Sequence, residues 1–148
     1  MIEHQLDRWI LASVDKHFRT LSTYAPFYVK GQKVGEHPEW FELAVFGPTW
    51  EQTTKGQHRV DCTIDLLISL IKISNVYRIN ELRGLAQLKF VNCIPIYRYG
   101  DVAKDAANDD SFVGDLLQQD EIETLNFSEG EIQRATLEQS YLIRYEEI

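Results

Sequence analysis

The chain has 148 residues, 44% of them apolar and 11% aromatic, which suffices to bury a core without disulfides or metals and excludes a disordered tail. Its formal net charge of −8 is uneven: residues 1–100 carry 12 basic and 10 acidic groups, whereas residues 101–148 carry 3 basic and 13 acidic ones. The acidic C-terminal third argues against nucleic acid as its ligand, because it would repel phosphates.

Residues 3–21 have the apolar spacing of an amphipathic helix. Leu6, Ile10, Val14 and Leu21 fall near one stripe, and most of the charged residues lie off it. The segment starts with charges and has no unbroken apolar run, so it does not read as a signal peptide. No stretch of the chain is long enough to cross a bilayer as a helix, and we therefore expect a soluble, cytosolic protein.

The next segments predict extended structure. Residues 26–32, which begin with Pro26, are predicted to be extended. Residues 39–46 predict a strand that ends at Gly47-Pro48, because glycine and proline interrupt regular structure. Residues 49–57 are polar and contain a glycine, which is typical of a hairpin tip or a mobile loop.

Residues 58–71 and 133–146 are two long alternating segments of about 14 residues each, against 5–6 in a typical strand. At roughly 3.3 Å per residue each spans about 45 Å, more than a compact core of this size. The first becomes apolar on both faces halfway along, so we expect it to pass from the edge of the structure into its middle. We expect the final segment to pair with residues 60–70, and the projecting ends to be covered by another subunit.

Two positions of the final segment break its alternation. Gln139 interrupts the apolar face and Leu142 is apolar on the polar face. Our interpretation is that one face passes here from the core to a subunit contact.

The remaining segments complete the fold prediction. A second helix is predicted for residues 74–90, an edge strand containing Pro95 for residues 93–100, an acidic loop for residues 101–111, and either a short helix or a twisted strand for residues 112–126. The predicted class is α+β: a mostly antiparallel or mixed β-sheet with two long strands, flanked by an N-terminal and a central helix, in a single domain of residues 1–148.

Motifs for catalysis and cofactors are missing from the sequence. The four histidines have no ligand spacing, and there is no CxxC, HExxH, GxGxxG, GKT, GKS or GxSxG. Cys62 and Cys93 lie in strand-like apolar runs, which favours buried, reduced thiols over a disulfide or a reactive thiol. We expect no catalytic residue, no cofactor and no metal, and hence no enzyme.

Aromatic residues are more numerous than one face of a small sheet needs, and tyrosine and tryptophan are favoured in protein interfaces. The predicted contact residues for a subunit or partner are Trp40, Phe46, Trp50, Lys55, Tyr141 and Tyr145. The predicted acidic surface, facing a lumen or a partner, comprises Asp101, Asp105, Asp109 and Asp110.

The order of these elements resembles the tail-terminator (tail-completion, head–tail joining) proteins of tailed bacteriophages. The resemblance covers nearly the whole chain and is one of arrangement, without a catalytic motif. It lies in the successive stretches "LDRWILASVDKHF", "FYVKGQ", "PEWFELAVFGP", "HRVDCTIDLLISL", "IPIYRYG" and "RATLEQSYLIRYEE".

The resemblance implies a hexameric ring of α+β subunits in the virion, assembled in the cytoplasm of the host bacterium. Such a ring caps the tail-tube protein, stops tail elongation and joins the head connector, with no membrane involved. The genome would pass through without specific binding, and our hypothesis is that the acidic region faces the lumen or a basic neighbouring ring.

Three other readings stay open. The chain could be another phage neck or head-completion protein or a tail-tube subunit, since these also use small subunits in rings. It could be a small bacterial ligand-binding α+β domain, which would need a concave apolar pocket with convergent polar groups. It could also be an enzyme whose site has no recognised motif.

Overall fold

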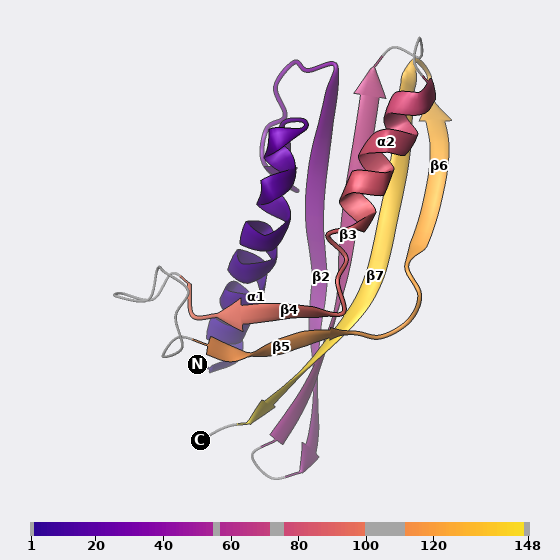
Figure 1. The fold of residues 1–148 in the computed structure, drawn as a ribbon. Coiled ribbons are helices and arrows are strands. Elements are labelled where there is room, and N and C mark those ends of the chain that lie inside the picture. Colours follow the sequence, from indigo (N-terminus) through magenta and orange to yellow (C-terminus); the bar gives the residue numbers. More distant parts are fainter. Residues whose placement is uncertain (1, 55–56, 72–75, 100–111, 147–148) are drawn as a thin grey trace.

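The computed structural model describes residues 2–54, 57–71, 76–99 and 112–146, and its architecture is α+β, as predicted (Figure 1). The elements in chain order are α1 (Ile2–Phe18), the 3-10 turn η1 (Arg19–Thr23), β1 (Phe27–Val29), β2 (Glu39–Thr54), β3 (Gln57–Ile71), α2 (Val76–Gln87), β4 (Cys93–Tyr97), β5 (Phe112–Gln118), β6 (Glu123–Glu129) and β7 (Ile132–Glu146).

One strongly curled, mixed sheet contains all of these strands. Their order is β1-β2-β3-β7-β5-β4, and β6 pairs separately with the first half of β7. Among the described strand pairs, β1–β2 is parallel and the others are antiparallel. β5 pairs with β7 at two positions, Leu117 with Leu142 and Gln118 with Tyr141, and the β4–β5 hairpin therefore runs across the long strands (Figure 1).

The two helices bury one face of this sheet. The buried positions of α1 recur at helical spacing and include Leu6, Ile10 and Val14, while α2 contributes Leu82 and Ala86. The opposing sheet positions alternate along each strand, so the core face comprises Phe41 and Leu43 of β2, Ile64, Leu66 and Ile68 of β3, and Ala135, Leu137 and Tyr141 of β7.

Polar contacts fix both helices to the sheet. Ser13 Oγ accepts a hydrogen bond from the Tyr97 N–H at 2.9 Å and donates to its carbonyl at 3.3 Å, which joins α1 to β4. Arg78 of α2 pairs with Glu39 at 2.6 Å, at the first residue of β2. This ion pair thus fixes the position of α2 on the sheet at the N-terminal turn of the helix.

The predicted end of β2 at Gly47-Pro48 is wrong. The strand continues to Thr54, and the pair forms an irregularity at which the register with β3 shifts between Phe46 and Thr49. Gly47 has a φ of +97°, and a Cβ there would lie 3.1 Å from the Asp61 carbonyl oxygen. A glycine is therefore needed inside the strand, where the bulge brings two backbones close together.

The segment 49–57, predicted as a hairpin tip or a mobile loop, belongs to the β2–β3 hairpin: residues 49–54 are the end of β2 and Gln57 begins β3. Three strands are therefore long, with 16 residues in β2 and 15 each in β3 and β7. The predicted pairing of the final segment is confirmed, since β7 pairs with β3 without a register shift from Ile132 with Ile71 to Glu146 with Gln57.

The expectation that β3 passes from the edge of the structure into its middle is confirmed, since the strand begins at the exposed Gln57 and ends in the buried run of Ile68, Ser69 and Leu70. β3 lies between β2 and β7 over nearly its whole length, so it is a central strand throughout. The predicted edge position of β4 is confirmed, which suits Pro95 because proline cannot donate to a neighbouring strand. The ambiguous segment 112–126 is extended: it contains β5 and the start of β6.

Gln139 faces the core and is 1% exposed, so it is no transition to a subunit contact. Its Oε1 accepts from Gln118 Nε2 at 2.9 Å, and its Nε2 donates to the Asp120 carbonyl. Leu142 is also buried, where β5 crosses β7. Both irregular positions belong to the joint between β5 and β7, because a buried amide there satisfies polar groups at the end of β5.

Candidate interaction surfaces

The face of the sheet opposite the two helices, called here the outer face, is covered by no helix of the described residues (Figure 1). Its side chains alternate with the core-facing ones, and include Glu42, Ala44 and Phe46 of β2, Thr63, Asp65 and Leu67 of β3, Thr136, Glu138 and Ser140 of β7, and Glu123 and Leu125 of β6. The outer face is thus partly apolar and rich in carboxylates.

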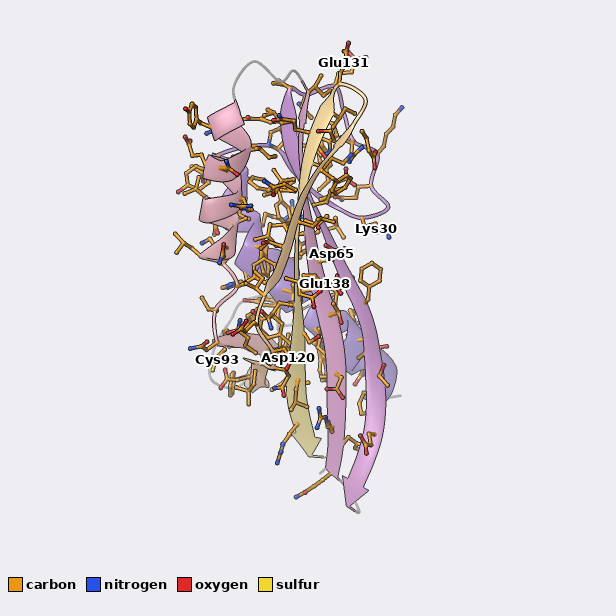
Figure 2. All side chains as sticks on the ribbon, turned by 90° about the vertical axis from the view of Figure 1, so that its right-hand side faces the viewer. Lys30, Asp65, Cys93, Asp120, Glu131 and Glu138 are labelled. Atoms are coloured by element: carbon orange, nitrogen blue, oxygen red, sulfur yellow. The ribbon has the colours of Figure 1, made fainter. Side chains whose placement is uncertain are left out.

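Three carboxylates lie in one cross-strand row of the outer face. The register places Asp65 beside Ala44 on one side and Glu138 on the other, and Glu138 beside Glu123. Figure 2 shows Asp65 and Glu138 side by side in the middle of the sheet. Burial, and secondarily the Glu138 charge, raises the pKa of Asp65, while Lys30 acts in the opposite direction. Like charges directly opposite each other destabilise a sheet, so a packing reason alone does not explain this row.

A small hollow of about 100 Å³ opens next to this row, lined by Lys30, Glu42, Ala44, Asp65 and Leu67. The short Ala44 side chain leaves the space, with longer neighbours around it. Asp65 Oδ1 is buried and has no hydrogen-bond partner among the described residues. The lining of the hollow therefore combines apolar and charged side chains with a carboxylate oxygen that has no hydrogen-bond partner among the described residues.

Beyond the core, β2, β3 and β7 continue together as a three-stranded ribbon (Figure 1). The last buried cross-strand row joins Trp50, Val60 and Ile143. We call residues 51–54, 57–59 and 144–146 the projecting ribbon. In the described chain, β2 has no strand on its other side here, because β1 pairs only with residues 41–43. The ribbon thus offers an unpaired strand edge.

Three of the predicted contact residues have described side chains at or near these surfaces. Trp40 is 8% exposed, and its Nε1–H donates to Glu42 Oε1 at 2.6 Å. Phe46 is 46% exposed on the outer face, with Lys30 Nζ 4.9 Å from its ring centre. The Trp50 ring is half-buried, edge-on to His58 at 5.2 Å, at the base of the projecting ribbon.

Tyr141 lies elsewhere. It is 0% exposed, and its hydroxyl donates to the Val91 carbonyl at 2.9 Å, so its surface is occupied within the core. The backbone of Tyr145 pairs with that of His58 in the ribbon. The side chain of Tyr145, and Lys55, fall outside the part that the structure describes, as do Asp101, Asp105, Asp109 and Asp110.

The two cysteines lie in different environments. Cys62 is buried, as expected, and burial raises the pKa of its thiol to about 12, which disfavours a reactive thiolate. Cys93 is exposed, contrary to expectation, because it begins the edge strand β4 with its side chain away from the core. The two thiols are not bonded to each other.

Larger, open concavities lie elsewhere on the described surface. One of about 520 Å³ lies at the β2 bulge and is lined in part by Phe46, Arg59, Asp61 and Asp120. Another of about 580 Å³ is lined by Gly35, Glu36, His37, Pro38, Trp40 and Ile71. Within the described residues no group of three or more His, Cys, Asp or Glu could hold a metal ion, and no helix is long and apolar enough to cross a membrane.

Sequence reasoning missed the carboxylate row and the hollow. The alternation placed Asp65 and Glu138 on the polar faces of their strands, which was an available signal. Bringing them opposite each other requires the exact register between β3 and β7, which alternation leaves open in steps of two residues.

Comparison with known proteins shows a shared fold. No family model and no curated protein matches the sequence. By contrast, 22 chains of solved structures match. One, designated only by a sequence identifier, superposes with a TM-score of 0.64 at 10% identity, over 91% of this chain and 93% of its own. At this identity the likeness concerns the fold alone.

Proposed function

We propose that this chain is a virion structural protein of the tail-terminator class, forming a hexameric ring that caps a bacteriophage tail tube. The ring stops tail elongation and provides the surface that joins the tail to the head connector. Its partners are copies of itself, the tail-tube protein and the connector, and it turns over no substrate. The proposed class follows from the resemblance of stretches of this sequence to that family.

The projecting ribbon is the observation that carries the proposal. A subunit with three strands of 15 or 16 residues exposes a strand edge and a ribbon end beyond its own core. Isolated edges of this kind favour unwanted pairing unless a neighbour covers them. In a ring, each ribbon lies against the adjacent subunit or the tube, and its length is useful.

The acidic segment belongs to the same proposal. Residues 101–148 carry the charge excess, and Asp101, Asp105, Asp109 and Asp110 remain a prediction because they fall outside the described residues. Carboxylates facing the lumen would repel DNA phosphates and allow the genome to slide through.

Electron microscopy of the purified protein, alone and mixed with tail tubes, tests the proposal. We expect six-fold rings, or caps at tube ends together with tubes of uniform length when the protein is present during tube assembly. A tube preparation without the protein is the control and should give lengths that vary more widely. A strict monomer that ignores tubes would contradict the proposal.

The concavity around Trp40 and His37 gives the ligand-binding reading its own test. Its volume of about 580 Å³ falls in the range of small-molecule sites, roughly 300–1,000 Å³, although it is open to solvent. A monomer whose thermal stability rises with a metabolite, and which leaves tubes unchanged, would favour that reading over a ring protein.

A further inference from the structure

We infer that the edge of β6 that faces away from β7, called here the far edge, joins the far edge of β6 in a second copy of this chain. The two strands run antiparallel, centred on Asn126, and continue the sheet of one subunit into that of the other across a two-fold axis. A two-fold contact does not by itself close a ring. The inference therefore goes beyond the proposed function and stands independently of it.

β6 is an edge strand that lacks the usual protection of an edge. Among the described strands it pairs with β7 alone, and it lies at the outside of the sheet (Figure 1). Its pairing runs from Glu123 to Glu129 without a register shift, and the residues between these ends have neither charge nor proline. Edge strands are commonly protected by lysine, proline or a bulge, which prevent pairing with another chain. The far edge is thus suited to accept a further strand.

The backbone groups of alternate β6 residues point to the far edge. The Ser140 carbonyl of β7 accepts a hydrogen bond from the Gln119 N–H at 3.0 Å, so the even-numbered residues of β7 direct their backbone groups away from β3. The register sets these residues opposite the odd-numbered residues of β6, which therefore bond to β7. The N–H and C=O groups of Thr124, Asn126 and Ser128 are consequently directed to the far edge.

The sequence of β6, "ETLNFSE", has similar residue types in both reading directions. An antiparallel copy centred on Asn126 sets Thr124 opposite Ser128 of the second copy, and sets Asn126 opposite its own counterpart. All of these residues have backbone groups at the far edge, so each opposed pair can exchange both N–H···O bonds. A register displaced by one residue would set outward groups against inward ones and lose these bonds.

The side chains also match across this joint. Leu125, which is 61% exposed, comes to lie opposite the half-buried Phe127 of the second copy on the outer face, and the symmetry repeats the contact. On the helix side, the hydroxyl of Thr124 faces that of Ser128. Apolar–aromatic and hydroxyl–hydroxyl pairs of this kind stabilise neighbouring strands. The second copy therefore covers an apolar side chain that the single chain leaves exposed.

The helix α2 leaves room for the second copy. It contacts β3 and β7 rather than the far edge, and its Arg83 and Asn80 hold the Asn126 side chain by hydrogen bonds of 3.0 and 3.3 Å. Three strand spacings separate β7 from the β7 of the second copy, about 14 Å in all. Packed helices need roughly 8–10 Å between their axes, so the two α2 helices fit side by side.

Like charges at the two ends weaken the joint. Glu123 lies opposite Glu129 of the second copy, and both residues are exposed. Glu129 is also paired with Arg134 of its own chain at 3.2 Å. Because opposed like charges destabilise a sheet and the joint is only one strand wide on each side, we expect a weak dimer that salt strengthens.

Charge exchange at these ends tests the register. Glu123→Lys turns both like-charge pairs into opposite-charge pairs, so it should tighten the dimer roughly tenfold or more in sedimentation equilibrium. The matched control combines Glu123→Lys with Glu129→Lys, which restores like charges across the joint while lowering the net negative charge further. It should dimerise no more tightly than the wild type. Stronger association of the double variant than of the single one would mean that net charge alone governs association, and would reject the inference.

Hydrogen exchange followed by NMR tests the backbone geometry of the wild type. As its concentration rises into the millimolar range, the amides of Thr124, Asn126 and Ser128 should become protected, whereas those of Leu125 and Phe127 already bond to β7 and should change less. A wild type that stays monomeric at millimolar concentration, or protection that does not depend on concentration, would overturn the inference.

A proline at the far edge gives a second test. Thr124→Pro removes an N–H directed to the second copy and leaves the pairing with β7 in place, so it should weaken the dimer. Thr124→Ala keeps that N–H and should weaken it much less. Thermal unfolding of dilute protein checks that both variants are folded. Equal dimerisation of the proline variant and the wild type would show that the backbone of β6 makes no contact with a second copy.

Other occupants of the far edge give a different result. Protection of these amides only after tail tubes are added would assign the edge to another protein and reject the second copy. The proposed function fails separately. Dimers that form through β6 but give neither rings nor tube caps would retain this joint and reject the tail-terminator role, and rings without any β6 pairing would do the reverse.

Discussion

Asp65 is a residue whose negative charge lowers the stability of the isolated subunit. It faces Glu138 across the β3–β7 pair, is partly buried, and has an oxygen without a partner in the described chain. Since burial and the neighbouring charge both raise its pKa, ionised Asp65 destabilises the isolated subunit. A residue that costs the monomer stability fits a role in contacting a partner.

Asp65→Asn should therefore stabilise the monomer at neutral pH, by roughly 0.2–1 kcal/mol, because it removes one of two like charges that face each other across the β3–β7 pair. In the wild type the folded state retains the Asp65 proton to higher pH than the unfolded state does. Its stability should fall as pH rises from the ordinary pKa of 3.8 through the raised folded value, and the loss is complete above that. Urea unfolding of dilute protein across this pH window measures both effects.

The control for this experiment is Glu131→Gln, which changes an exposed carboxylate in the β6–β7 turn. It should alter neither the unfolding free energy nor its pH dependence by a comparable amount. If Asp65→Asn destabilises the monomer instead, the Asp65 carboxylate has a stabilising partner within the monomer, and the hollow is not a site that binds a cation.

At the scale of elements, the bulge in β2 shows pairing prevailing over local preference. Gly47 and Pro48 predict a strand end by their intrinsic properties, yet the strand resumes after them with a shifted register. A bulge bends and twists a strand without ending it, because the strand on either side remains paired. The ladder with β3, on which β7 also pairs, thus overrides the local preference of two residues.

Gly47→Ala should cost about 1–3 kcal/mol of stability, because alanine is strained at a φ of +97°. The added Cβ would also lie 3.1 Å from the Asp61 carbonyl oxygen, a backbone atom that cannot rotate away. The matched control is Gly84→Ala in α2, where a Cβ would meet nothing within 4 Å and should add roughly 0.5–1 kcal/mol. Thermal unfolding of both variants measures the contrast, and equal effects would mean that the bulge adapts freely.

For the whole molecule, the core and the projecting ribbon differ in composition, and in our proposal they differ in function. The core ends at the row formed by Trp50, Val60 and Ile143, and the ribbon continues past it with mainly polar residues. Because the ribbon side chains that the structure describes are polar and at least partly exposed, they add little buried apolar surface and contribute little to the stability of an isolated subunit. Its length is then expected to serve assembly.

Shortening the ribbon tests that division. Deleting residues 51–52 together with 58–59 removes two cross-strand pairs, so the side chains that remain keep their faces. We expect a folded monomer with a small loss of stability, and impaired rings or tube caps in electron microscopy. Deleting all of 49–57 is a poorer test, since it would also remove Trp50, which packs against the core.

A full-length variant with the same four residues replaced by threonine is the matched control for length. It should assemble nearly as the wild type does if ribbon length matters, and as poorly as the deletion if the side chains make the contact. An unfolded deletion variant would place the ribbon within the core, contrary to the burial pattern.

The sequence by itself determined what depends on local periodicity. Two helices, the alternating strands and the edge position of Pro95 follow from spacing and from the missing N–H of proline. The polar face on which Asp65 lies follows in the same way. The resemblance to tail terminators also came from the order of these segments, and it remains a proposal.

Only the tertiary structure decided what depends on register and crossing. The row of Asp65 and Glu138 exists because β3 and β7 align at one of several registers that alternation allows. Gln139 and Tyr141 became core residues because β5 and the segment after α2 supply hydrogen-bond partners from positions distant in sequence. Such hydrogen-bond partners depend on the path of the whole chain, so local sequence patterns do not predict them.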